Sequence, residues 1–337
     1  YQDINEVQQQ LLKIIAGHRA QVMVVGDVDQ CIYEWRGAKP EYITTRFAQD
    51  FPNPVTYTLS YTFRFGHRLS LAANHLITNN RLRDRKLCLS FPGTPDTTLS
   101  SCQEKEPHPV LAILADLADE GLPAAEVAVL VRMFAMSVPV ELALLDAHIP
   151  YRLVGHEPVF ACPEIKALTG YLHLCQDSLG AIEPAVRQDI IEAMLTHPHL
   201  GVKREKISEL AASIAHRPER AMELILYAAD QDAPPFVQKR FTQTAEIWHE
   251  IGMLPSSAKA GQILETVIKK TNLFDFYRNI SSRISTAENR IKTCQAFVAF
   301  AWRLDLAVAP FLEKIQTLQQ QDAATVGDSL LITSIHR

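Results

Sequence analysis

The chain has 337 residues, 47 % hydrophobic and 21 % charged, and a formal net charge of −5. This composition is typical of a folded protein of about two domains and excludes a disordered or coiled-coil chain. The net charge excludes a general basic field, so a nucleic-acid partner would need local basic patches. No apolar run predicts a membrane span, and six widely spaced cysteines without a Cys-x-x-Cys pair indicate a reduced, cytoplasmic protein.

Residues 1–55 predict two helices around one strand. Apolar residues recur at helical spacing from Val7 to Ile15, and Gly17 ends this helix. The continuous apolar run at 21–25 predicts a strand buried on both faces of a parallel sheet. Residues 40–48 predict a short helix.

Strands and helices then alternate to about residue 177. The predicted strands are 55–59, 127–131 and 151–154, and the predicted helices are 66–79, 109–120, 138–147 and 164–177. This alternation predicts a layered α/β domain with a parallel sheet. Residues 178–323 predict helices alone, and 330–335 return to a strand. An α/β domain that stops and later resumes indicates an inserted helical block.

The segment Gly26–Ala38 directly follows the first predicted strand, where open α/β sheets bind ligands. The Gln30 carboxamide can donate to a phosphate oxygen and accept from a water. Tyr33 and Trp35 offer rings on which bases can stack, and Arg36 can hold a phosphate or stack as a cation. The alternative is a surface turn whose aromatic rings complete the core.

A second candidate segment, 59–65, lies at a predicted strand end. Arg64 can contact a phosphate, and Phe63 can stack on a purine. Residues 60–90 hold one acid, Asp84, and six basic residues: Arg64, Arg68, Arg81, Arg83, Arg85 and Lys86. A solvated helix end is the alternative for the last four of these.

Arg132 ends the predicted strand 127–131 and is a third candidate for a nucleic-acid phosphate. The twelve histidines form no metal-ligand set, and we expect His197 and His199, which flank Pro198, to be solvated. The sequence holds no G-x-x-x-x-G-K-[ST] phosphate loop and no recognisable Ser/His/Asp or Cys/His arrangement.

These segments together resemble the superfamily one helicases of the UvrD/Rep/PcrA type. Gly26–Ala38 matches almost all of that family's G-D-x-D-Q-x-I-Y-x-x-R-G-A motif. Leu59–Phe65 matches L-x-x-N-Y-R-S loosely, because it keeps Arg64 but has Thr62, Phe63 and Phe65 at the Asn, Tyr and Ser positions.

Further matches extend the resemblance over residues 1–177 and 325–337. Tyr1–Asp3 resembles the tail of the magnesium motif D-E-x-Q-D, and the segment 127–172 resembles the A-V-L-x-R to E-I-K run. Thr333–Arg337 is similar to the start of T-x-H-x-x-K-G-L-E. The helical block matches weakly.

The resemblance implies an α/β fold with RecA-like domains. Residues 1–55 would be the C-terminal part of a first RecA-like domain, and 56–177 the first segment of a second. Residues 178–323 would be an inserted all-helical subdomain, and 324–337 the resumed, truncated second domain. Because the phosphate loop and the Asp-Glu pair are missing, we expect a fragment cut at both ends and inactive by itself.

The resemblance also implies a function: an ATP-dependent DNA helicase that translocates on single-stranded DNA, 3′ to 5′, and unwinds duplex. ATP and Mg²⁺ would be its cofactors, with no metal ligand in this chain. Its partners would be single-stranded DNA, single-strand/duplex junctions and repair or replication proteins, without a membrane.

The same resemblance implies roles for individual residues. Gln30 and Arg64 would be catalytic, and Asp27, Phe63 and Arg64 would bind the nucleotide. The implied DNA-binding residues are Tyr33, Trp35, Arg36, Arg132, Thr333 and His336. Two alternatives stay open: the motor of a recombination helicase-nuclease subunit, and a degenerate helicase-like module that binds DNA or protein without catalysis.

Overall fold

The computed structural model describes residues 1–81, 86–103, 108–229, 233–322 and 329–335. Two compact units make up the chain, an N-terminal unit, Tyr1–Gln103, and a C-terminal unit, Glu104–Ile335. Both contain helices and parallel strand pairs, so the fold is mixed α/β. The boundary predicted after residue 55 lies inside the N-terminal unit, and the domain assignment stays a prediction.

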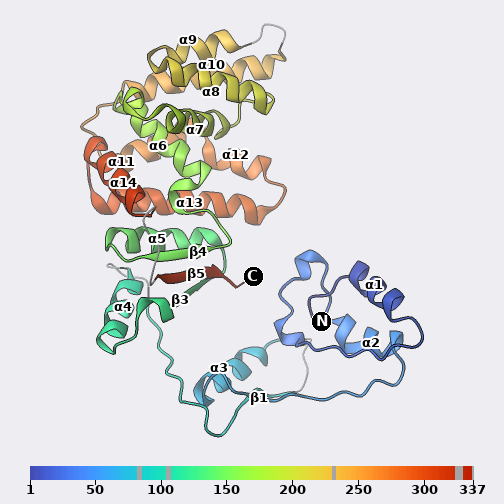
Figure 1. Cartoon of the computed structure of the whole chain (residues 1–337). Coiled ribbons are helices and arrows are strands. Elements are labelled where there is room, and N and C mark those ends of the chain that lie inside the picture. The colour runs from blue at the N-terminus through green and yellow to red at the C-terminus, as the bar shows by residue number, and fades with distance from the viewer. Residues whose placement is uncertain (82–85, 104–107, 230–232, 323–328, 336–337) are drawn as a thin grey trace. The chain divides into compact units, whose positions relative to one another are not determined.

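The N-terminal unit consists of short elements (Figure 1). Its helices and strands are α1 (Glu6–Ala16), a π-helix (Tyr42–Arg46), α2 (Phe47–Asp50), β1 (Tyr61–Thr62), α3 (His67–Ile77) and β2 (Leu89–Ser90). A capping box between Asn5 and Gln8 begins α1, and Gly17, with φ at 55°, ends it. The helix predicted at 40–48 is present as the π-helix and α2, and the helix predicted at 66–79 is present as α3, both with shifted bounds.

The two strands predicted in this unit are wrong. Residues 21–25 and 55–59 form no strand, and Met23 is 88 % exposed. Among the described residues of this unit, the only sheet is the two-residue parallel pair of β1 and β2. A strand needs a neighbour to satisfy its backbone N–H and C=O groups, so an apolar run without one stays irregular.

The C-terminal unit contains a three-stranded parallel sheet. Its strands are β3 (Ala128–Val131), β4 (Tyr151–Val154) and β5 (Leu330–Ser334), in the order β3-β5-β4. In the register, Leu130 lies beside Thr333 and Val154 lies beside the same residue from the other side. The strand that is last in sequence is thus the central strand, and the three predicted strands of this unit are confirmed.

Helices lie beside this sheet and continue away from it. They are α4 (Pro109–Asp119), α5 (Ser137–Asp146), α6 (Pro163–Cys175), α7 (Pro184–Thr196), α8 (Arg204–His216), α9 (Ala221–Ala228), α10 (Pro235–Gly252), α11 (Ala260–Thr271), α12 (Leu273–Ile280), α13 (Ile284–Leu304) and α14 (Val308–Asp322). Proline begins α4, α6, α7 and α10. At the first position of a helix a backbone N–H has no acceptor within the helix, so the N–H that proline lacks costs no hydrogen bond.

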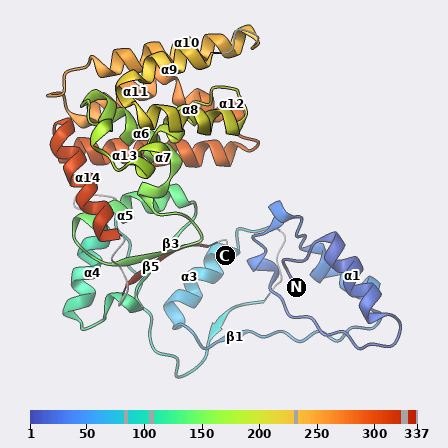
Figure 2. The same ribbon diagram turned by 45° about the horizontal axis from the view of Figure 1, so that its top comes forward.

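One hydrophobic core runs through the C-terminal unit. The buried helix α5 contacts α13 and α14, and α6 contacts α7, α10, α11, α13 and α14. Figures 1 and 2 show α5 beside the sheet and α9 and α10 farthest from it. Among the described residues, the stretch between α6 and β5 is helical apart from short turns and two isolated bridges.

Candidate functional site

The turn Gly26–Ala38 is built from two short 3₁₀ helices, Val28–Gln30 and Glu34–Arg36. The Asp27 carboxylate accepts a hydrogen bond from the Asp29 backbone N–H and caps the first helix. Gly37 ends the second helix with φ at 87°, a conformation that favours glycine. The turn therefore holds Gln30 and the aromatic residues on successive short helices.

Asp27 lies at the centre of a small polar cluster. Its Oδ2 accepts from Gln30 Nε2 at 2.7 Å, and its Oδ1 accepts from Lys86 Nζ at 2.5 Å. Burial raises the pKa of Asp27, but the hydrogen bonds from Lys86 and Gln30 outweigh it and leave the pKa below its ordinary value. The sequence placed Lys86 only in a basic stretch, whose Arg83 and Arg85 lie outside the described residues.

Arg36 brings the aromatic residues of the turn together. Its guanidinium lies 4.6 Å from the ring centre of Trp35 and 5.3 Å from that of Tyr33. The two rings are 6.4 Å apart, and Trp35 is 52 % exposed. Such a cation–aromatic group offers a flat face to a base and a positive charge to a phosphate. The alternative that both aromatics complete the core is wrong for Trp35.

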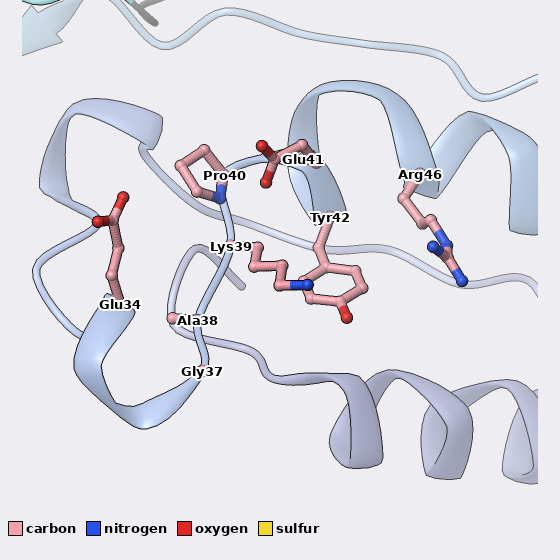
Figure 3. A pocket seen from close by; sticks show the side chains of 8 residues that line it. All are labelled: Glu34, Gly37, Ala38, Lys39, Pro40, Glu41, Tyr42 and Arg46. Atoms are coloured by element: carbon pink, nitrogen blue, oxygen red, sulfur yellow. The ribbon is translucent and has the colours of Figure 1, made fainter.

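An open pocket of about 520 Å³ lies around the end of this turn and the residues that follow it (Figure 3). Its lining includes Glu34, Lys39, Glu41, Tyr42 and Arg46. In Figure 3, the Lys39 side chain runs toward the Tyr42 ring, and Glu34 and Arg46 stand at opposite sides. Acidic and basic groups are balanced here, so the pocket has no clear preference for an anion.

Phe63 and Arg64 directly follow β1. The Phe63 ring packs against Phe91 at 4.7 Å between ring centres, and Phe91 meets Tyr61 edge-on at 6.2 Å. Phe63 is 69 % exposed, so its outer face can stack on a base while Phe91 supports it. Arg64 is exposed, as a group that contacts a ligand phosphate must be. Sequence reasoning missed Phe91, which lies outside every predicted helix and strand.

Arg132 and Thr333 lie at one end of the sheet in the C-terminal unit. Arg132 is exposed and follows the last residue of β3. Thr333 lies one residue before the end of β5, and its hydroxyl donates to the Val154 carbonyl at 3.3 Å. The carboxyl ends of parallel strands meet at one edge, so both residues lie at the edge where α/β sheets bind ligands. His336 lies outside the described residues.

Histidine placement differs from the prediction at one position. His197 is buried rather than solvated, because it packs edge-on against Tyr277 at 5.9 Å. Within the part of the chain that the structure describes, no cluster of three or more His, Cys, Asp or Glu side chains is arranged to hold a metal ion. In that same part, no helix is both long and apolar enough to cross a membrane.

Comparison with known proteins shows which proteins this chain resembles. Residues 1–52 match the UvrD/REP helicase N-terminal domain model. DNA helicase II of Escherichia coli K12 is 38 % identical over 177 residues, which are 52 % of this chain and 24 % of that protein. The chain is a UvrD/Rep-type helicase relative. The matched family region contains the whole Gly26–Ala38 turn.

Two further UvrD/Rep-type proteins show how far the similarity extends. ATP-dependent DNA helicase Rep of Escherichia coli K12 is 34 % identical over 178 residues, 52 % of this chain and 26 % of that protein. ATP-dependent DNA helicase UvrD2 of Mycobacterium bovis is 32 % identical over 259 residues, 71 % of this chain and 37 % of that protein. The chain thus spans about a quarter to two fifths of these relatives.

Proposed function

We propose that this chain is part of the motor of an ATP-dependent DNA helicase. The observation that carries the proposal is the turn Gly26–Ala38, which contains both the Arg36 guanidinium over two aromatic rings and the Asp27–Gln30 hydrogen bond. The residues that we propose to hold single-stranded DNA thus lie a few positions in sequence from Gln30, which we propose to respond to a phosphate. The names of the relatives support this reading.

The domain organisation that we propose follows the UvrD/Rep pattern. Residues 1–55 would complete a first RecA-like domain, and 56–177 with 324–337 would form most of a second. Residues 178–323 would be its helical insertion. Two observations support this organisation: β5 pairs with β3 and β4 across the helical stretch, and all three strands are parallel.

At the nucleotide, each residue has a distinct proposed task. ATP, when bound, supplies the phosphoryl group that hydrolysis releases. Gln30 contacts the terminal phosphate or the water beside it, with Asp27 holding its amide. Arg64 stabilises the negative charge that develops during transfer, and Phe63 stacks on the adenine. Because the chain has no phosphate loop, we propose that turnover be measured on the complete gene product.

DNA contacts are proposed for each unit separately. Tyr33, Trp35 and Arg36 hold bases and a phosphate of single-stranded DNA, and Arg132 and Thr333 contact phosphates at the sheet edge. His336 is proposed as a DNA contact from the family resemblance alone. Translocation in the 3′ to 5′ direction, and partners in repair or replication, are further parts of the proposal.

Substitution of Trp35 tests the DNA-binding role directly on this chain. We expect Trp35→Ala to weaken binding of a fluorescent oligothymidylate by about 5- to 150-fold, since one lost base stack costs about 1–3 kcal/mol. Fluorescence anisotropy at fixed salt measures the dissociation constant. The matched control is Trp302→Ala, which removes a partly exposed tryptophan of the helical stretch. Equal weakening by both variants, or none by Trp35→Ala, would contradict the proposal.

A further inference from the structure

Both oxygens of the Asp27 carboxylate accept hydrogen bonds from neighbouring residues. Its Oδ1 accepts from the Asp29 N–H at 3.1 Å and from Lys86 Nζ at 2.5 Å, and its Oδ2 accepts from Gln30 Nε2 at 2.7 Å. Asp29 and Gln30 are local partners, whereas Lys86 is 59 positions away in the chain. Lys86 is therefore the long-range cation that holds this carboxylate in place.

This arrangement determines which way the Gln30 amide faces. An ionised carboxylate is an acceptor only, so the Gln30 atom that faces Asp27 must be Nε2. The amide oxygen Oε1 then points away from Asp27, and Gln30 itself is exposed. Gln30 thus presents a hydrogen-bond acceptor, together with the second hydrogen of Nε2, to a ligand or a water.

The N-terminal unit contains the same arrangement a second time, with a different outcome. Asp50 accepts from Lys13 Nζ at 2.5 Å on Oδ1 and from Gln9 Nε2 at 2.8 Å on Oδ2. Gln9, however, is 0 % exposed, and its Oε1 accepts from the Tyr1 hydroxyl. Both ends of the Gln9 amide are used within the protein, so this copy is structural.

The arrangement at Asp27 differs, because the Gln30 amide oxygen is not used within it. Among the residues that the structure describes, none donates a hydrogen bond to Gln30 Oε1. A glutamine held firmly at one end and open at the other is suited to contact a ligand with a fixed orientation. In Gln9 the corresponding oxygen accepts a hydrogen bond inside the protein, so an Asp–Lys–Gln arrangement of this kind does not by itself leave the glutamine oxygen without a donor.

We propose that Lys86 is a positioning residue for Gln30, acting through Asp27. The inference rests on the proposed function, in which Gln30 contacts the terminal phosphate or its water. Lys86 neutralises Asp27 and pins its carboxylate, and Asp27 in turn keeps the Gln30 oxygen facing outward. Without Lys86 the carboxylate can turn, and Gln30 loses its fixed orientation.

Nuclear magnetic resonance of the 337-residue chain tests the positioning without any activity. Gln30→Ala assigns the Gln30 side-chain amide signals in a sample labelled with ¹⁵N-glutamine. We expect Lys86→Met to shift these signals and Lys86→Arg to restore them. Lys13→Met, which removes the matched ion pair at Asp50, should shift Gln9 and leave Gln30 unchanged. Unchanged Gln30 signals in Lys86→Met would refute the inference.

ATP turnover of the complete gene product with single-stranded DNA then tests the consequence. Lys86→Met should lower kcat about 10- to 100-fold, because a Gln30 amide without a fixed orientation contacts the terminal phosphate or its water less well in the transition state. KM should stay within about twofold, since ground-state binding is not removed. Lys86→Arg should recover most of kcat, and Lys13→Met should leave it unchanged.

The two possible failures are distinguishable. Full turnover in Gln30→Ala would contradict the proposed role of Gln30, and with it the catalytic part of this inference. Lost turnover in Gln30→Ala with normal kcat in Lys86→Met would contradict the role of Lys86 alone.

Discussion

The sequence predicted those residues of the candidate site whose partners are close in the chain, and it missed those whose partners are far away. Tyr33, Trp35 and Arg36 are close in sequence, and the short 3₁₀ helix at 34–36 brings them together as expected. Lys86 was predicted only as one member of a basic stretch, because no local pattern encodes a partner 59 positions away. Phe91 was missed for the same reason, since its contacts with Tyr61 and Phe63 depend on the pairing of β1 with β2.

Glu141 is a buried carboxylate that the sequence did not distinguish from scaffold. Its Oε1 accepts from the Ser137 hydroxyl at 2.6 Å, and its Oε2 accepts from the Val159 N–H at 3.0 Å and the Tyr151 hydroxyl at 3.3 Å. It thereby joins α5 to β4 and to the turn that precedes α6.

We predict that Glu141→Ala lowers the free energy of unfolding of the C-terminal unit by about 3 kcal/mol, because it leaves buried donors without an acceptor. Glu141→Gln keeps one acceptor and should cost about 1 kcal/mol. Urea unfolding of the chain measures both. A loss in Glu141→Ala no larger than that in Glu141→Gln would contradict this reading.

At the scale of elements, a strand forms where a neighbour is available. The apolar runs 21–25 and 128–131 look alike in sequence, yet only the second is a strand, because β5 lies beside it. Helices were predicted more reliably, since their hydrogen bonds lie within the segment. The stops of α11 and α13 at Asn272 and Asp305, both left-handed, are also local features.

Two histidines of the C-terminal unit, half-buried His173 in α6 and buried His197 directly after α7, make the free energy of unfolding depend on pH. Burial lowers the pKa of His173 in α6 and of His197 after α7 from 6.5 to about 4. Between these values the unfolded chain binds protons that the folded chain does not, so the free energy of unfolding falls as pH falls. Above about pH 6.5 both histidines are neutral in the folded and the unfolded chain, so their effect on the free energy of unfolding no longer changes with pH.

We expect each histidine to contribute up to about 3 kcal/mol to this loss between pH 6.5 and 4. Urea unfolding at pH 7, 6, 5 and 4.5 measures the slope. His173→Gln and His197→Gln should each show a smaller loss than the parent chain over this range. Identical slopes in the parent and both variants would show that these histidines titrate normally when folded.

At the scale of the molecule, the central position of β5 ties distant parts of the C-terminal unit together. Ile332 is buried in β5 and lies between Val129 of β3 and Leu153 of β4. The sequence predicted the three strands, but not their order. The order depends on a pairing across the helical stretch.

We predict that Ile332→Ala lowers the free energy of unfolding of the C-terminal unit by about 2–5 kcal/mol, as expected for a buried large-to-small change. Hydrogen exchange should lose protection at β3 and β4 together. Ile335→Ala, at a half-exposed position just after β5, should cost less than about 1 kcal/mol. Loss of protection in β5 alone would contradict the central role of this strand.

Local sequence patterns were enough to predict the Gly26–Ala38 turn with its aromatic residues and Arg36, most helices and the strands of the C-terminal unit. These depend on residues close in the chain, whose spacing already encodes a cap, a turn or an amphipathic face. Long-range packing was needed to establish which apolar runs form strands, the strand order β3-β5-β4, and the contacts of Lys86 with Asp27 and of Phe91 with Phe63. Each of these joins residues far apart in sequence, and no local pattern records a partner that folding alone brings near.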